Sequence, residues 1–267
     1  SYGWEVTPPL VPTLVGCGQT ITQSILVLNS LTNCLGDGLV VGADKITIDL
    51  NGNSIDGVFT VETAGVRNPG FDDVTIRNGT IQEFDLGVLL AADTARGLVE
   101  GLDVLGHTVG GIALLGVADS TVRDNSFSAN GDAIQLIDGA VRNTVRNNDI
   151  SGSVGLGLAV VNATANVIEQ NTVAGSGDQA IELTASSFNR LIGNSISGSS
   201  DQAFVLEEGS NDNYVDGNTV TGSEAGIKIS DAHRLTLINN RVSGSSDNGI
   251  EMDAVFDLPY TRRPHPR

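Results

Sequence analysis

The chain has few positive charges, few aromatic residues and no long hydrophobic run. Of its 267 residues, 14 are Lys or Arg and 32 are Asp or Glu, which gives a net charge of −18. Nucleic acids and anionic membrane surfaces are bound through basic patches, so this charge argues against both as partners. No apolar run approaches the roughly 18 residues that a membrane span requires, so we expect no membrane insertion.

The same composition is poor in helix-forming residues. Aromatic residues make up 4% of the chain, whereas glycine alone contributes 33 residues. Gly, Asn, Ser, Thr and Val all rank low as helix formers, and they suit short strands joined by many turns. Hydrophobic residues reach 40%, which is enough for a folded core. The composition therefore predicts an all-β protein.

Cysteine is scarce, and both cysteines, Cys17 and Cys34, lie near the N-terminus. Two cysteines are too few for a disulfide scaffold or a four-cysteine zinc site. A disulfide that closes this short loop is the favoured interpretation, and it would place the protein outside the cytosol. Two buried free thiols are the alternative.

A repeated Asn-x-(Ile/Val/Phe) motif dominates the second half of the chain. Its asparagines are Asn125, Asn148, Asn171, Asn194, Asn218 and Asn240, so the motif recurs at a nearly constant interval of about 23 residues. Each repeat contains three short apolar stretches that alternate with polar residues, as in Ile181-Glu182-Leu183. That alternation is typical of strands with one buried face.

A unit of about 23 residues with three strands cannot bury its apolar face alone, but stacked units can. The repeat therefore predicts a right-handed parallel β-helix of about nine coils, with three strands per coil. We expect the asparagine at each corner to adopt left-handed backbone angles and to hydrogen-bond with the asparagines of the coils above and below.

The repeat also sets the expected domain boundaries. Residues 39–256 form the β-helix, residues 1–38 break the register and are expected to cap its first coil, and residues 257–267 form an irregular tail with three prolines. An open β-helix end is a sheet edge that invites pairing. We therefore expect either an end-to-end or a tail-mediated oligomer.

The chain resembles a known family in several segments. These are Cys17-Gly-Gln-Thr-Ile-Thr, the stretch Gly42-Ala-Asp-Lys-Ile-Thr-Ile-Asp-Leu-Asn-Gly52, and repeats such as Asn171-Thr-Val-Ala-Gly-Ser-Gly-Asp. They resemble the secreted bacterial β-helix proteins of the pectin-lyase-like superfamily, including the NosD-type and the carbohydrate-binding and sugar-hydrolase repeats. The resemblance implies secretion and polysaccharide lyase, hydrolase or epimerase activity. The Asp-Pro-His signature of alginate epimerases is absent, so no catalytic residue is transferred from the family.

One outward column of side chains contains the best candidate for catalysis. The period aligns Gln135, Ala159, Glu182, Val205, Lys228 and Glu251. Glu207 lies one coil above Glu182 and two residues further along, roughly 8 Å away by strand spacing. Inverting glycosidases separate their two carboxyl groups by about 6.5–9.5 Å. Glu182, Glu207 and Lys228 are thus candidate catalytic residues, with Glu251 beside them; a solvated acidic face is the alternative.

A second outward column is rich in arginine. It aligns Arg77, Glu100, Arg123, Arg146 and Glu169, and Arg190 and Tyr214 lie next to it. These arginines and the tyrosine could hold the carboxylates of an acidic polysaccharide or cell-surface glycan through bidentate hydrogen bonds. Alternating charge is also what cross-strand pairing favours, so a purely structural ladder is the alternative.

Aspartates recur at one turn of the repeat. Asp178 and Asp201 occupy matching turns on adjacent coils, and Asp247 follows two coils later. A Ca²⁺ ion with oxygen ligands would relieve the repulsion between Asp178 and Asp201. Alternatively, each aspartate caps its own turn through backbone N–H groups.

Two functional classes therefore stay open. One is a secreted carbohydrate-active protein that cleaves a polysaccharide as a hydrolase or lyase. The other is a non-catalytic carbohydrate-binding or structural surface protein. A groove lined by Glu182, Glu207 and Lys228 would favour the enzyme, whereas a flat sheet would favour the second class.

Overall fold

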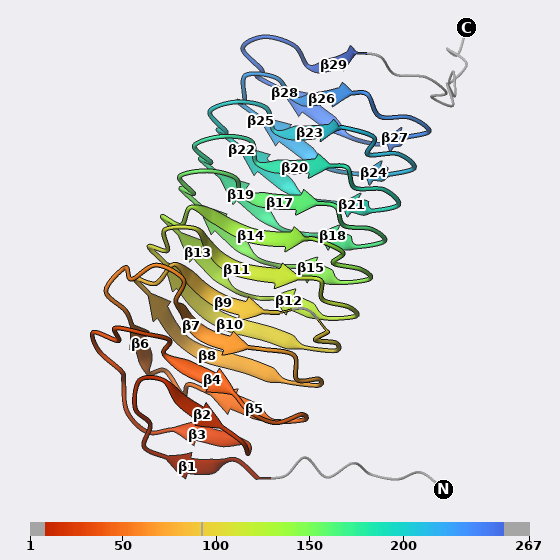
Figure 1. Cartoon of the computed structure of the whole chain (residues 1–267). Helices are drawn as coiled ribbons and strands as arrows, with labels where there is room; N and C mark the ends of the chain where they lie inside the picture. Colours follow the sequence, from red (N-terminus) through yellow and green to blue (C-terminus); the bar gives the residue numbers. More distant parts are fainter. Residues whose placement is uncertain (1–8, 92, 254–267) are drawn as a thin grey trace, which may run out of the picture.

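The computed structural model describes residues 9–91 and 93–253, and every strand in these ranges pairs in parallel with its neighbours. Figure 1 shows the coils stacked from the N-terminal to the C-terminal end of the molecule as a parallel β-helix. The expected tail at 257–267 lies outside the described residues, as do the first eight residues of the expected cap. No described helix is long and apolar enough to cross a membrane.

Each coil contributes strands to three columns. The first column is the 11-stranded sheet of β2 (Gln19–Ile21), β4 (Leu39–Val41), β7 (Ala64–Asn68), β9 (Leu86–Leu90), β11 (Gly110–Leu115), β14 (Asp132–Ile137), β17 (Leu158–Val161), β20 (Ile181–Thr184), β23 (Phe204–Glu207), β26 (Ile227–Ser230) and β29 (Ile250–Asp253).

The second and third columns together form the 18-stranded sheet. The second column contains β1 (Val11–Thr13), β3 (Ile25–Val27), β5 (Thr47–Asp49), β8 (Thr75–Gln82), β10 (Leu98–Leu105), β12 (Thr121–Arg123), β15 (Thr144–Arg146), β18 (Val167–Glu169), β21 (Arg190–Ile192), β24 (Tyr214–Asp216) and β27 (Thr236–Ile238). The third contains β6 (Ser54–Asp56), β13 (Ser126–Ser128), β16 (Asp149–Ser151), β19 (Thr172–Ala174), β22 (Ser195–Ser197), β25 (Thr219–Thr221) and β28 (Arg241–Ser243), and β8 and β10 run through both columns.

The register confirms the predicted repeat. Val145 pairs with Ile168 in the second column, and Ile150 pairs with Val173 in the third, in each case one repeat further along the chain. The eleven strands of the first column give about ten coils, against the nine expected. The additional strands β1, β2 and β3 lie inside the segment expected to be the cap; β2 pairs with β4 and β3 with β5 of the coil above, whereas β1 pairs with β3 from below.

The predicted asparagine ladder is present at the corner before the third column. In its centre, Asn171 donates from Nδ2 to Asn194 Oδ1 at 3.1 Å and to the Val145 carbonyl at 3.0 Å. Its own Oδ1 accepts from the backbone N–H and Nδ2 of Asn148. We refer to Asn125, Asn148, Asn171, Asn194, Asn218 and Asn240 as the asparagine ladder.

The expected left-handed backbone at these asparagines is wrong by one residue. Positive φ occurs at the preceding residue of each corner, for example at Asn147 (54°) and Gln170 (56°), and at none of the six asparagines. A second ladder of Asn143, Asn166, Asn189 and Asn213 runs along the corner before the second column. Buried amides therefore saturate the backbone at two corners of each coil.

Cys17 and Cys34 form the predicted disulfide. It joins the turn before β2 to the segment before β4, so it ties the first coil to the second. Cys34 is buried whereas Cys17 is exposed. The N-terminal coil thus has a covalent clamp in a region where the asparagine ladder has not yet begun.

Candidate functional site

The acidic candidates lie on the outward face of the first column, as the repeat predicted. Glu182 pairs with Val205, and Thr184 pairs with Glu207, so the two glutamates lie on adjacent coils and two residues apart. Thr184 Oγ1 donates to Glu182 Oε1 at 2.6 Å, which orients that carboxylate. Lys228 pairs with Val205 on one side and with Glu251 on the other. The four candidate side chains therefore lie on neighbouring strands of one face.

Glu207 has a perturbed environment. Partial burial raises the pKa of its carboxyl, and the nearby carboxylates of Glu182 and Glu208 raise it further. Lys228 acts in the opposite direction, which also places its charge close to Glu207. A carboxyl group with a raised pKa beside a second carboxylate is an arrangement that general acid–base catalysis uses.

The arginine column is in the predicted register, but two of its members are already paired. Arg77 forms an ion pair with Asp49 at 2.8 Å, and Arg123 forms one with Glu100 at 2.5 Å. Arg123 also lies 3.3 Å from Asp124. The guanidinium of Arg123 is thus engaged by protein carboxylates, and its role in binding a substrate carboxylate stays a prediction. Arg146 forms no ion pair within the part of the chain that the structure describes.

Arg190 and Tyr214 lie on adjacent strands, β21 and β24, and are in register. The Arg190 guanidinium lies 5.3 Å from the centre of the Tyr214 ring, and the Tyr214 hydroxyl donates to Asp216 at 3.0 Å. Arg190 is exposed and, within residues 9–91 and 93–253, has no carboxylate within 4.0 Å. It is thus available to an anionic group. Glu251, placed with the binding residues from the sequence, lies on the other column with Lys228.

Phe188 was missed by the sequence analysis. Its side chain is 61% exposed at the turn that leads into β21, two residues before Arg190. The signal that could have found it is the turn position itself: aligned residues such as Arg142, two coils below, and Asp212, on the coil above, are charged, whereas this one is aromatic.

The turn aspartates lie as expected on successive coils. Asp201 accepts hydrogen bonds from Gln179 Nε2 at 3.1 Å and from Gln202 Nε2. Among residues 9–91 and 93–253 there is no group of three or more His, Cys, Asp or Glu side chains arranged to hold a metal. Two carboxylates supply fewer oxygens than the six to eight that Ca²⁺ takes. Calcium at Asp178 and Asp201 stays a prediction.

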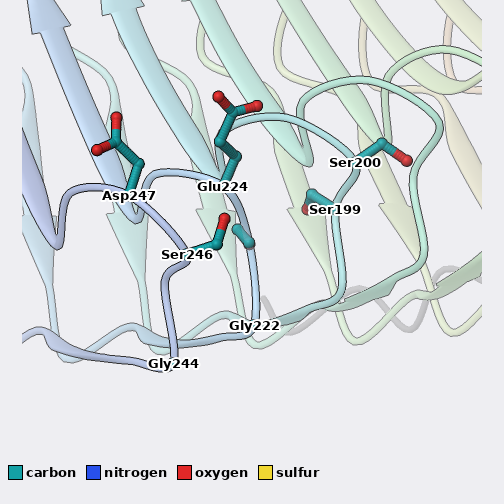
Figure 2. Close-up of a pocket in the computed structure, with 8 residues that line it drawn as sticks. Ser199, Ser200, Gly222, Glu224, Gly244, Ser246 and Asp247 are labelled. Carbon is teal, nitrogen blue, oxygen red and sulfur yellow. The ribbon is translucent and has the colours of Figure 1, made fainter.

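A polar hollow of about 480 Å³ opens at the same turn of three successive coils, beginning with Ser199 and Ser200 next to Asp201. Figure 2 shows its lining, with the Glu224 and Asp247 carboxylates above and the serine side chains below them. Three residues separate Ser223 from Ile227, whereas four separate Ser199 from Phe204 in the coil below. The turn in the middle of the hollow is thus one residue shorter than the turn below it. Neither this hollow nor the one beside the disulfide includes Glu182, Glu207 or Lys228.

Comparisons with known proteins were made for sequence and for fold. A comparison with curated proteins gives no match. Among solved structures, an alginate lyase from Paenibacillus sp. str. FPU-7 is similar with a TM-score of 0.63 at 15% identity, over 89% of this chain and 99% of the lyase chain.

Two further structures are similar over 90% of this chain, which spans 60% of each of theirs. They are the catalytic domain of a GH87 α-1,3-glucanase, with a TM-score of 0.69 and 10% identity, and the Dettilon tailspike protein, with 0.64 and 15%. At these identities the likeness shows the fold alone. The model of the right-handed β-helix region matches residues 20–173, 64–220 and 159–258. Because these matches span most of the chain, it belongs to the right-handed β-helix family.

Proposed function

We propose that this protein is a secreted carbohydrate-active β-helix protein that hydrolyses a glycosidic bond of a polysaccharide or cell-surface glycan. The observation that carries the proposal is the placement of Glu207 beside Glu182 on the adjacent coil, where the pKa of the Glu207 carboxyl is raised. Two carboxyl groups whose environments differ in this way can divide the roles of acid and base.

In the proposed reaction, Glu207 donates its proton to the glycosidic oxygen while Glu182 removes a proton from an attacking water. The water oxygen bonds to the anomeric carbon as the bond to the leaving sugar breaks. Glu207 ends ionised and Glu182 ends protonated, and exchange with solvent restores both. The separation of roughly 8 Å expected from their strand positions leaves room for the water and matches an inverting reaction. The positive charge of Lys228 lies close to Glu207 and favours its ionised form.

Secretion is part of the proposal. The disulfide between Cys17 and Cys34 is of a kind that persists in oxidising compartments, and the structural neighbours include a polysaccharide lyase and a phage tailspike. The acidic surface, with a net charge of −18, also suits solubility outside the cell.

The first experiment is a screen of the purified protein on neutral and acidic polysaccharides, with and without Ca²⁺. New reducing ends without absorbance from unsaturated uronate would identify a hydrolase. Glu207→Gln and Glu182→Gln should then each lower kcat by about 100-fold or more. Glu224→Gln, at the turn before β26, is the matched control and should keep full activity. Uronate absorbance together with reducing ends would identify a lyase and overturn the hydrolase assignment.

A second candidate is non-catalytic carbohydrate binding. It is favoured by the uniform coils: the ladder asparagines from Asn125 to Asn240 keep a nearly constant spacing, so no long loop in this stretch walls a cleft over β20, β23 and β26. Silence across the whole polysaccharide panel, combined with measurable binding to one of its members, would decide for this candidate.

A further inference from the structure

One turn position holds non-glycine residues in left-handed backbone conformation on nine successive coils. We call Lys45, Asp73, Arg96, Asp119, Arg142, Ala165, Phe188, Asp212 and Arg234 the turn column, with φ between 53° and 61° throughout. Each of its first eight members donates its backbone N–H to the residue that precedes the next member, as Phe188 does to the Asn211 carbonyl at 3.1 Å. The conformation is thus imposed by the stacking of coils.

The turn column alternates in charge, except at two coils. Arg96 pairs with Asp73 at 2.8 Å, Arg142 with Asp119 at 2.7 Å, and Arg234 with Asp212 at 2.6 Å, and Lys45 precedes Asp73. Between Arg142 and Asp212 the series is interrupted by Ala165 and Phe188. An acidic and a basic residue at these two positions would continue the alternation.

Phe188 is unfavourable for folding at its position in two ways. A bulky aromatic residue is strained in the left-handed region, where Asn, Asp and Gly are favoured. Phe188 is also 61% exposed to solvent, whereas Asp212 on the coil above and Arg142 two coils below form ion pairs at this position. Strain combined with an exposed apolar group at one rigid site indicates a binding role.

The arginines add a second, independent indication. Six of the nine arginines in residues 9–91 and 93–253 form ion pairs with protein carboxylates; the three that form none are Arg146, Arg190 and Arg241. Arg190 lies two residues from Phe188 and stacks on Tyr214. Arg146 lies on the same column of strands, two coils below Arg190. In a protein with 32 acidic residues, unpaired arginines beside an exposed ring are complementary to an anionic ligand.

We propose that Phe188, Arg190 and Tyr214, extended by Arg146, form a binding site for an anionic glycan. The Phe188 ring would stack on the apolar face of a sugar, and the guanidinium groups would bind its carboxylate or sulfate groups. The choice of a glycan rests on the proposed function, whereas the anionic character of the ligand follows from the unpaired arginines. The site lies on the column next to the Glu182 and Glu207 face, so a bound chain could be held there without contacting the two glutamates.

The test is isothermal titration calorimetry, which measures the affinity of the full chain for polygalacturonate, dextran sulfate and neutral dextran. Phe188→Asn and Arg190→Gln should each weaken binding of the anionic polymers by about tenfold or more, a change of the size expected for a central contact. Arg241→Gln is the matched control, because it removes one unpaired arginine on a different column and should change the affinity less than about twofold. Preference for polygalacturonate or for dextran sulfate identifies the anionic group.

A thermal melt separates binding from folding. Because Asn suits the left-handed backbone better than Phe, Phe188→Asn should raise Tm by about 2–4 °C while it loses affinity. Equal loss of affinity in Phe188→Asn and Arg241→Gln, full affinity in Phe188→Asn, or no binding of either anionic polymer by the native chain would overturn the site. Binding of an anionic polymer without cleavage of any glycan would keep this site and defeat only the hydrolase proposal. Cleavage of a neutral glycan without binding of either anionic polymer would keep the hydrolase proposal and defeat this site.

Discussion

Two buried polar residues flank strand β19, and they differ in how their side chains are hydrogen-bonded. Asn171, just before the strand, has both its amide nitrogen and its carbonyl oxygen satisfied by residues of the adjacent coils. Ser176, two residues after the strand, is only 1% exposed, and its hydroxyl finds no partner among the described residues. A buried polar side chain therefore stabilises its coil only where it is long enough to form a hydrogen bond with the next coil.

The same contrast appears within one column of side chains. His107 and Asn130 occupy the first two coils of this column and are hydrogen-bonded. The next five coils hold the serine column, Ser153, Ser176, Ser199, Ser223 and Ser245, whose hydroxyl oxygens are all buried without a partner in the described part of the chain. The ladders therefore stabilise the coils through hydrogen bonds. The serine column contributes mainly through its small side chains, which let the coils pack closely.

The largest expected effect comes from breaking the asparagine ladder in its middle. Asn171→Ala would remove four hydrogen bonds and leave the Asn148 backbone N–H buried without its partner. We expect a loss of about 3–5 kcal/mol in the free energy of unfolding, measured by denaturant titration. A loss below about 1 kcal/mol would show that the ladder is not a stabilising device.

The disulfide offers a covalent counterpart at the end that the asparagine ladder does not reach. Cys17→Ser with Cys34→Ser opens a loop with a sequence separation of 17 residues. Loop entropy predicts a loss of about 3 kcal/mol, to be measured by denaturant titration of the double variant. Protection of β2 amides from hydrogen exchange should fall first, and unchanged protection there would contradict a clamping role.

His107, which precedes Asn130 and the serine column on the same column of side chains, gives a pH-dependent test. Burial lowers the pKa of His107 to about 4. Its Nδ1 accepts from the Phe84 backbone N–H at 3.2 Å, so Nε2 carries the proton that bonds the Ile81 carbonyl at 3.1 Å. The unfolded chain binds a proton below its ordinary pKa of 6.5, whereas the folded chain does so only near 4.

Stability from His107 is therefore full above pH 6.5 and is lost as the pH falls toward 4, by up to about 3 kcal/mol. The measurement is a series of denaturant titrations between pH 7 and 4. His107→Asn, which does not titrate, should flatten this part of the profile. An identical slope in the variant would assign the loss to other groups.

The smallest expected change in the free energy of unfolding is also the only one of these that is not a loss. Ser176→Ala removes a buried hydroxyl that has no partner among the described residues, so we expect unchanged stability or a gain of up to about 1 kcal/mol. A comparison of this variant with Asn171→Ala on the same coil separates the effect of lost hydrogen bonds on stability from the effect of burying a polar group. A loss of more than about 1 kcal/mol would show that the serine column is bonded in solution.

The strand register of this protein could be predicted well because its repeat has a nearly constant length. The nearly constant spacing placed Glu182 beside Val205 and Lys228 beside Glu251 in the observed register. The disulfide followed from having two cysteines close in sequence. The second ladder, at Asn143, Asn166, Asn189 and Asn213, carries the same period and could have been found in the same way.

The outer surface could be predicted only in part. The sequence aligned Arg77, Glu100 and Arg123, but not which arginines were already paired, since that depends on side-chain geometry across three strands. The period places Phe188 at a turn, but the sequence does not show that it is exposed in left-handed conformation, because an isolated Phe usually belongs to the core.

The sequence by itself determined the coil, its three strands, the asparagine ladder and the registers of the outward columns, because a constant period transfers each residue onto the same place of the next coil. Only the tertiary structure decided which charges are neutralised, which turn residues are held left-handed, and that Phe188 and Arg190 are exposed. The physical reason is that period fixes backbone position, whereas ion pairing, burial and pKa depend on side-chain contacts between coils, which vary from one coil to the next.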